Sequence, residues 1–148
     1  MWNPPNPKEF FAQVWLIAKQ IPEGQVSTYG QIASMIPPPE GVTPPEYNRL
    51  RARWVGTAMN NTPAEEGIPW QRVINSKGAI SLPAGTPGAN KQVTLLESEG
   101  VTFNEQEQVD FEQCGWNGPD ETWLREHGFY PPKPLRKSGG KSEQLSLF

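Results

Sequence analysis

The side chains best suited to nucleophilic, redox or metal chemistry are rare in this sequence. Its 148 residues include one cysteine, Cys114, and one histidine, His127. A single cysteine excludes an internal disulfide framework and a cysteine-rich zinc site, and a single histidine argues against a histidine-based metal site. The sequence therefore predicts a protein without a metal ion or another cofactor.

The net charge of −3 argues against a nucleic-acid partner, but the charges are unevenly distributed along the chain. Residues 97–126 hold nine acidic residues and one arginine, whereas residues 48–77 hold five basic residues and two acidic ones. This layout is compatible with ordinary solvated faces, and equally with a basic docking surface for nucleic acid on an acidic protein. The basic residues of the second stretch are Arg49, Arg51, Arg53, Arg72 and Lys77.

The length suits one domain with a real core, and the mean hydropathy of −0.63 is that of a polar but globular chain. No apolar stretch is long enough to span a bilayer, and the N-terminus lacks the pattern of a secretory signal. We therefore expect a cytoplasmic protein without a membrane partner, and a monomer.

The elements that would position a site are mostly helical. Apolar spacing predicts helices over residues 8–20 and 46–60, and Pro45 suits the start of the second of these. Between them, Thr28 followed by Gln31 fits a capping box that opens a short helix, which residues 37–39, all proline, would end. Two adjacent helices with arginines on the second have the outline of a helix-turn-helix reader of DNA.

The following segment adds a small β element and a further helix. Residues 68–81 read as a strand over Arg72–Ile74, a turn at residues 75–78 and a second short strand, which together would form the wing of a winged helix. A last helix is expected over residues 90–99, closed by Gly100. The predicted fold class is therefore mainly α, winged helix-turn-helix-like, with a small β wing.

Four segments carry a resemblance to a known family. IPEGQVSTYGQIA, RARWVGTAM, IPWQRVINSKG and LLESEGV, in this order and spacing, resemble the C-terminal domain of the O6-alkylguanine-DNA alkyltransferases. The resemblance covers about residues 8–103 and implies the fold of that domain. It also implies double-stranded DNA with an O6-alkylguanine as the partner.

The acceptor motif of that family is altered here. Alkyltransferases carry Pro-Cys-His-Arg, whereas this chain reads Pro69-Trp70-Gln71-Arg72. An indole has no thiolate equivalent, and a glutamine is no general base near neutral pH, so only the match to the family's glutamate, Glu99, remains of the cysteine-activating relay. Tryptophan at this position resembles the alkyltransferase-like proteins, which bind alkylated DNA and are not enzymes.

The resemblance also assigns roles to individual residues. Tyr29 matches the tyrosine that presses on a phosphate and helps rotate the target nucleotide, and Arg53 matches the arginine that fills the gap left by the flipped base. The remaining expected DNA contacts are Thr28, Ala52, Gly56 and Arg72, and the expected lesion pocket consists of Trp70, Pro69, Gln71 and Ser81.

The function expected from these residues is non-enzymatic recognition of O6-alkylguanine by minor-groove binding and base flipping, which flags the lesion for nucleotide excision repair proteins. Two alternatives stay open at this point. The first is an active alkyltransferase that uses another residue, such as Cys114. The second is a winged-helix regulator that reads an intact DNA sequence.

The C-terminus carries a separate signal. Residues 1–130 are expected to form the DNA-binding domain with its C-terminal extension, and residues 131–148 a flexible tail. The tail ends in Gln144, Leu145, Leu147 and Phe148, which resemble the peptide by which bacterial replication and repair proteins bind the sliding clamp. This predicts a bacterial protein that associates with the nucleoid when bound to DNA.

Overall fold

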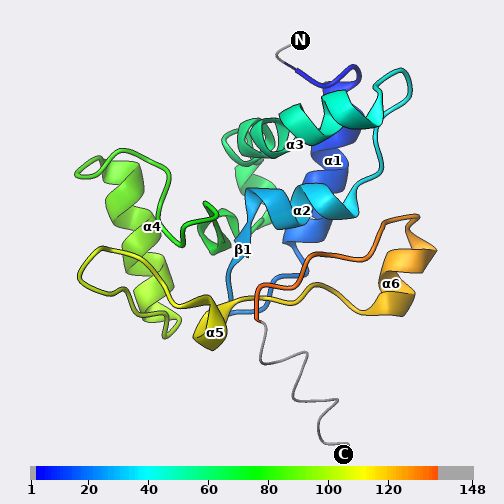
Figure 1. Cartoon of the computed structure of the whole chain (residues 1–148). Coiled ribbons are helices and arrows are strands. Elements are labelled where there is room, and N and C mark those ends of the chain that lie inside the picture. Colours follow the sequence, from blue (N-terminus) through cyan, green and yellow to red (C-terminus); the bar gives the residue numbers. More distant parts are fainter. Residues whose placement is uncertain (1–2, 137–148) are drawn as a thin grey trace, which may run out of the picture.

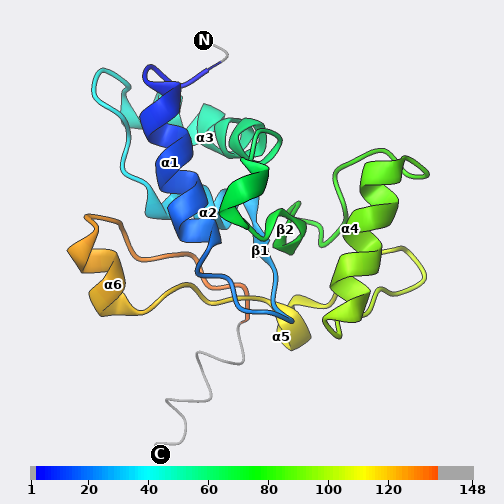
Figure 2. The ribbon, with the colours of Figure 1, turned by 180° about the vertical axis from the view of Figure 1, so that it is seen from behind.

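The computed structural model of the chain describes residues 3–136. Three helices, α1 (Pro7–Ala18), α2 (Tyr29–Met35) and α3 (Pro44–Met59), pack together on one side of a two-stranded sheet. Helix α4 (Pro87–Ser98) lies on the other side of this sheet, as both views show (Figures 1 and 2). The fold is thus mainly helical, as the sequence predicted.

The long helices begin where proline and a capping side chain coincide. Helices α1, α3 and α4 each have a proline in the first turn, preceded by a residue whose side chain accepts a hydrogen bond from a backbone N–H of that turn. These capping residues are Asn6, Thr43 and Thr86. Gly100 follows α4 with a φ of +96°, so the predicted C-terminal glycine cap is present.

Only half of the predicted capping box forms at the start of α2. Thr28 Oγ1 accepts a hydrogen bond from the Gln31 N–H at 3.0 Å. The Gln31 side chain turns away from the backbone of Thr28 and donates to the carbonyls of Trp116 at 2.7 Å and Lys133 at 2.8 Å. Gln31 therefore fastens the C-terminal segment to α2 instead of closing the box.

Aromatic side chains fill the core between the three helices. Phe10 lies edge-on to Tyr47 and Trp54, with ring centroids 6.4 and 5.7 Å apart. The Tyr47 hydroxyl donates to the Ile36 carbonyl at 2.8 Å, and burial raises the pKa of this hydroxyl above its usual value. Trp15 Nε1 donates to the Ala58 carbonyl at 2.8 Å, which ties α1 to the end of α3.

The sheet differs from the predicted wing. β1 (Ser27–Thr28) pairs in parallel with β2 (Val73–Ile74), which follows the 3₁₀ turns η1 (Ala64–Glu66) and η2 (Trp70–Arg72). Within residues 3–136 no strand follows the turn at residues 75–78, so the predicted hairpin is wrong. The Gly78 carbonyl instead accepts from the Val109 N–H at 2.8 Å, because the chain returns to cover this edge.

The C-terminal extension runs along the base of the molecule through α5 (Phe111–Cys114) and α6 (Glu121–Glu126) (Figure 1). Val26 and Gly115 form a parallel bridge, and the Trp116 side chain is buried. Asn117 Oδ1 accepts from the N–H groups of Leu135 and Arg136. The packed chain thus reaches Arg136, past the boundary at residue 130 that the sequence predicted.

No helix in the described range is both long and apolar enough to cross a membrane.

Candidate functional site

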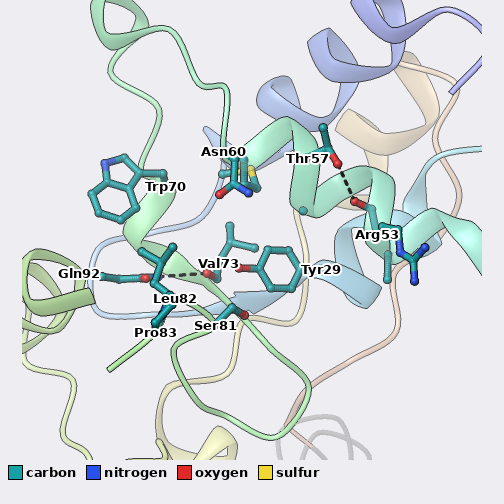
Figure 3. A pocket seen from close by; sticks show the side chains of 13 residues that line it. Tyr29, Arg53, Thr57, Asn60, Trp70, Val73, Ser81, Leu82, Pro83 and Gln92 are labelled. Carbon is teal, nitrogen blue, oxygen red and sulfur yellow. Dashed lines mark hydrogen bonds between the residues drawn. The ribbon is translucent and has the colours of Figure 1, made fainter. Parts of the chain in front are cut away.

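A pocket of about 530 Å³ opens between the three-helix unit and α4. The start of α2 and one face of α3 form one side, and the η2 turn, β2 and residues 81–83 form the other. Figure 3 shows Trp70 and Arg53 at opposite ends of this pocket, with Tyr29 and Asn60 between them. Its lining residues are Tyr29, Ala52, Arg53, Gly56, Thr57, Met59, Asn60, Trp70, Val73, Ser81, Leu82, Pro83 and Gln92.

Six residues that the sequence singled out meet in this pocket. They come from four segments of the chain, the start of α2, α3, the η2 turn and the loop after β2, and local structure places those of α2 and α3. The Thr28 cap makes the following residue the first of α2, while helical spacing puts three residues on one face of α3. The six are Tyr29, Ala52, Arg53, Gly56, Trp70 and Ser81.

The face of α3 that lines the pocket carries small residues and has open space in front of it. Ala52 and Gly56 are one helical turn apart, and a Cβ added at Gly56 would meet no heavy atom within 4 Å. Gly56 does not have a positive φ either, so neither packing nor backbone conformation within the protein requires glycine there. The small residues leave room for another molecule to approach the α3 backbone closely.

Two of the expected DNA contacts are engaged inside the protein. Thr28 is buried and uses its hydroxyl to cap α2. Arg72, whose side chain is only 17% exposed, donates to Glu99 and to the Ile21 carbonyl. The sequence predicted the capping role of Thr28, but it could not show the contacts of Arg72, whose partners lie 27 and 51 residues away.

Two of the expected pocket residues lie behind the pocket. Pro69 and Gln71 line a neighbouring hollow of about 730 Å³, which the Trp70 side chain shares with the first pocket. Conversely, sequence reasoning missed Asn60 and Gln92. The helical spacing of Asn60 from Gly56 would have indicated the former, whereas no local pattern points to Gln92.

Two residues that line the hollow, Gln71 and Arg72, bind the carboxylate of Glu99. Arg72 binds Glu99 through two hydrogen bonds, Nε to Oε1 at 2.9 Å and Nη2 to Oε2 at 3.0 Å. The same carboxylate accepts from Gln71 Nε2 at 2.8 Å and from the Gly24 N–H at 3.2 Å. Glu99 thereby joins the end of α4, the η2 turn and the loop before β1.

These contacts set the ionisation of Glu99. Burial raises the pKa of this carboxyl group, but the hydrogen bonds from Arg72, Gln71 and Gly24, together with the Arg72 charge, outweigh burial and lower the pKa below its usual value. Glu99 is therefore a carboxylate at neutral pH. Its neighbour Gln71 is an amide, so the pair cannot relay a proton as a histidine and a glutamate would.

The pocket has no thiol, imidazole or amine that could accept an alkyl group. Its lining includes no cysteine, histidine or lysine, and Trp70 presents an indole. Cys114 is buried in the separate cluster with Val26, Ile74 and Leu96, and burial and the Asp110 charge raise the pKa of its thiol. Among the residues that the structure describes, no group of His, Cys, Asp and Glu side chains could hold a metal ion.

Replacing Glu99 by glutamine should destabilise the fold in a pH-dependent way. Because the folded pKa of Glu99 is lowered, its stabilisation is complete above the unfolded glutamate pKa of about 4.3 and is lost as the pH falls through the lower folded value. We expect Glu99→Gln to lower the free energy of unfolding by about 1.5–3 kcal/mol at pH 7, and by less below about pH 4. Urea denaturation at both pH values measures this.

The matched control is Glu97→Gln, on the exposed face of the same helix, which should change the stability by less than about 0.5 kcal/mol. Equal losses in the two variants, or a loss for Glu99→Gln that does not change with pH, would contradict the role given to Glu99.

Comparisons with known proteins agree with this geometry. The family model of the 6-O-methylguanine DNA methyltransferase DNA-binding domain matches residues 9–101. The DNA base-flipping protein of Vibrio parahaemolyticus is 39% identical over 108 residues, which are 73% of this chain and 96% of that protein. Alkyltransferase-like protein 1 of Schizosaccharomyces pombe is 38% identical over 115 residues, which are 78% of this chain and 94% of that protein.

A solved structure is similar as well. The crystal structure of S. pombe Atl1 in complex with damaged DNA containing O6-carboxymethylguanine matches with a TM-score of 0.55 and 34% identity, over 74% of this chain and 95% of that chain. The chain therefore belongs to the family of the 6-O-methylguanine DNA methyltransferase DNA-binding domain, as an alkyltransferase-like member.

Proposed function

We propose that this protein recognises O6-alkylguanine in double-stranded DNA, flips the damaged base into the pocket and leaves the alkyl group in place. The observation that carries the proposal is the pocket itself, which brings Tyr29, Arg53 and Trp70 together and has no cysteine in its lining. The names of the two relatives, a base-flipping protein and an alkyltransferase-like protein, support it, as does the damaged DNA bound to the S. pombe structure.

Trp70 has a binding role in this proposal. An aromatic face in contact with a base contributes about 1–3 kcal/mol whichever base it is, so Trp70 can retain an extruded base. Transfer of the alkyl group would need a thiolate or a similar nucleophile, which an indole does not supply. The lesion therefore stays on the DNA for as long as the complex lasts.

Arg53 and Tyr29 stabilise the opened duplex. Arg53 is exposed on the pocket side of α3, where its flat cation can enter the base stack and hydrogen-bond to the base left without a partner. Tyr29, the first residue of α2, lines the same pocket. Extruding a base costs a few kcal/mol, and less for a damaged pair, so the same contacts favour the lesion over an intact pair.

The small residues on the pocket side of α3 suit insertion into a narrow groove of DNA. Because Ala52 and Gly56 project little from the helix, its backbone can approach DNA more closely than a helix that carries long side chains there. Proteins that bind the minor groove commonly widen it and bend the duplex while a side chain enters the stack. The proposal thus places α3 in the minor groove, with Arg53 directed into the stack.

A protein that binds a lesion without removing it needs a second activity downstream. The class of activity that fits is excision of the damaged strand, so nucleotide excision repair proteins are the proposed partners. Their recruitment would make the bound protein a flag on the DNA. The proposal places it in the bacterial cytoplasm, at the nucleoid when bound.

The variant Arg53→Ala tests the flipping mechanism. It should weaken binding to a duplex with O6-methylguanine by about 1–3 kcal/mol, and weaken binding to the guanine duplex less, because the arginine acts only after extrusion. Fluorescence anisotropy with both duplexes at one salt concentration measures the ratio of the two affinities.

The matched control is Arg49→Ala, one helical turn earlier on α3 and outside the pocket lining. It should weaken binding to both duplexes to the same extent, as the loss of a general electrostatic contact does. If Arg53→Ala also leaves the ratio of affinities unchanged, Arg53 has no part in flipping.

The C-terminal peptide adds a proposed partner, the bacterial sliding clamp. Gln144, Leu145, Leu147 and Phe148 lie outside the residues that the structure describes, so this proposal rests on the sequence. A glutamine can anchor a peptide by hydrogen bonds, and three large apolar side chains can fill an apolar groove. Binding to the clamp would deliver the protein to DNA where replication or repair is under way.

Deleting residues 144–148 should abolish clamp binding. We expect the full chain to bind the clamp with a Kd in the micromolar range, about −8 kcal/mol, and the shortened chain not to bind measurably. Isothermal titration calorimetry measures both. A control with Ser142 and Glu143 replaced by alanine should bind like the full chain, and equal affinity of the full and shortened chains would contradict the assignment.

A further inference from the structure

Gln92 is a buried polar residue of the pocket that sequence reasoning did not single out. It lies on the face of α4 directed toward β2, and only 3% of the residue is exposed. Figure 3 shows its side chain extending from α4 toward Val73, beside Leu82 and Pro83. A buried glutamine requires hydrogen-bond partners, so its contacts reveal what it can still bind.

The orientation of the Gln92 amide is fixed by the backbone. Its Nε2 atom donates to the carbonyl of Gln71 at 3.1 Å and to that of Val73 at 3.2 Å. Because only the nitrogen of a glutamine amide can donate to a carbonyl, the amide cannot be turned the other way round. Both amide protons are used, and the position of Oε1 follows.

Oε1 remains available as an acceptor. Within residues 3–136 no hydrogen bond reaches this oxygen. It is also absent from the buried side-chain atoms that lack a partner in this range, which are Trp54 Nε1 and Arg136 Nε. Oε1 is therefore not completely enclosed by the protein, and the cavity that Gln92 lines is the lesion pocket.

The chemistry of the flipped base decides which group can satisfy this acceptor. Alkylation of O6 removes the proton from N1, so N1, N3, N7 and O6 of O6-alkylguanine are all acceptors. The exocyclic 2-amino group is then the only N–H donor on the base. A carbonyl oxygen that points into the pocket can accept a hydrogen bond from this amino group. A purine without the 2-amino group would leave that oxygen unpaired.

We propose that Gln92 is a specificity-determining residue whose Oε1 accepts a hydrogen bond from the 2-amino group of the flipped base. This inference rests on the proposed lesion binding and extends it: the pocket selects purines with a 2-amino group, and hence lesions derived from guanine over those derived from adenine. Since guanine carries the same amino group, Gln92 does not itself distinguish the lesion from the intact base.

A pair of lesions that differ only in the 2-amino group tests the inference. We expect the wild-type protein to bind a duplex with O6-methylguanine about tenfold more tightly than the same duplex with O6-methylhypoxanthine. In the variant Gln92→Met, which keeps the length of the side chain but has no amide, this ratio should fall to about one to two. Fluorescence anisotropy with both duplexes gives the ratio for each protein.

The ratio of the affinities for the two lesions distinguishes a contact of Gln92 with the base from a purely structural role of Gln92. Loss of the bonds to Gln71 and Val73 would weaken binding of both lesions alike and leave the ratio unchanged. The control Gln20→Met, at an exposed site, should keep the wild-type ratio. If Gln92→Met does not fold, two other results can still overturn the inference. The first is equal affinity of the wild-type protein for the two lesions. The second is a variant Gln92→Leu that prefers O6-methylguanine by the same ratio as the wild-type protein.

The unmodified guanine duplex distinguishes the two levels of the proposal. If the wild-type protein does not prefer O6-methylguanine over guanine, lesion recognition itself fails, and the inference fails with it. If it prefers the lesion but Gln92→Met retains the wild-type ratio, only the assignment of Gln92 is wrong.

Discussion

The Glu99 carboxylate connects three segments that are distant in the sequence, and the shape of the site depends on it. Arg72 and Gln71 hold the η2 turn to it, and the Gly24 N–H holds the loop that leads to β1 and α2. Trp70 begins η2, and Tyr29 begins α2, so one part-buried anion at the end of α4 holds the segments that lead into both of these residues. Such a carboxylate stabilises its surroundings only while every partner is in place, because an unpaired buried charge is costly.

The same contacts explain how a transferase scaffold can serve as a sensor. In the alkyltransferases that the sequence resembles, a histidine and a glutamate activate the acceptor cysteine. Here Gln71 donates to Glu99 at 2.8 Å, so the geometry of a relay persists without a group that takes up a proton. Trp70 then occupies the position of the nucleophile and adds an aromatic wall. The architecture for holding a base is retained while the chemistry is absent.

The sequence predicted the parts of the fold that local chemistry determines. Apolar spacing, Pro45 and Thr28 near two helix starts, and Gly100 at a helix end located α1 to α4 to within about three residues, and Tyr29, Arg53 and Trp70 do meet in one pocket. The contacts of Arg72 within the protein could not be predicted because its partners are distant in sequence, and the predicted hairpin is wrong because Val109 returns to the edge beside Gly78. Gln92 was missed because its contacts exist only once α4 packs against η2 and β2.

If the protein binds an alkylated base and leaves it unrepaired, the alkyl group must still be on the DNA after binding. The protein is incubated in equimolar amount with a duplex containing O6-methylguanine, and the methyl group is then located by mass spectrometry of the intact protein and of the digested DNA. We expect tight, lesion-selective binding with all of the methyl still on guanine. A gain of about 14 Da on the protein in stoichiometric yield, the mass of one methyl replacing a proton, would show that a residue here acts as an acceptor and would contradict the account.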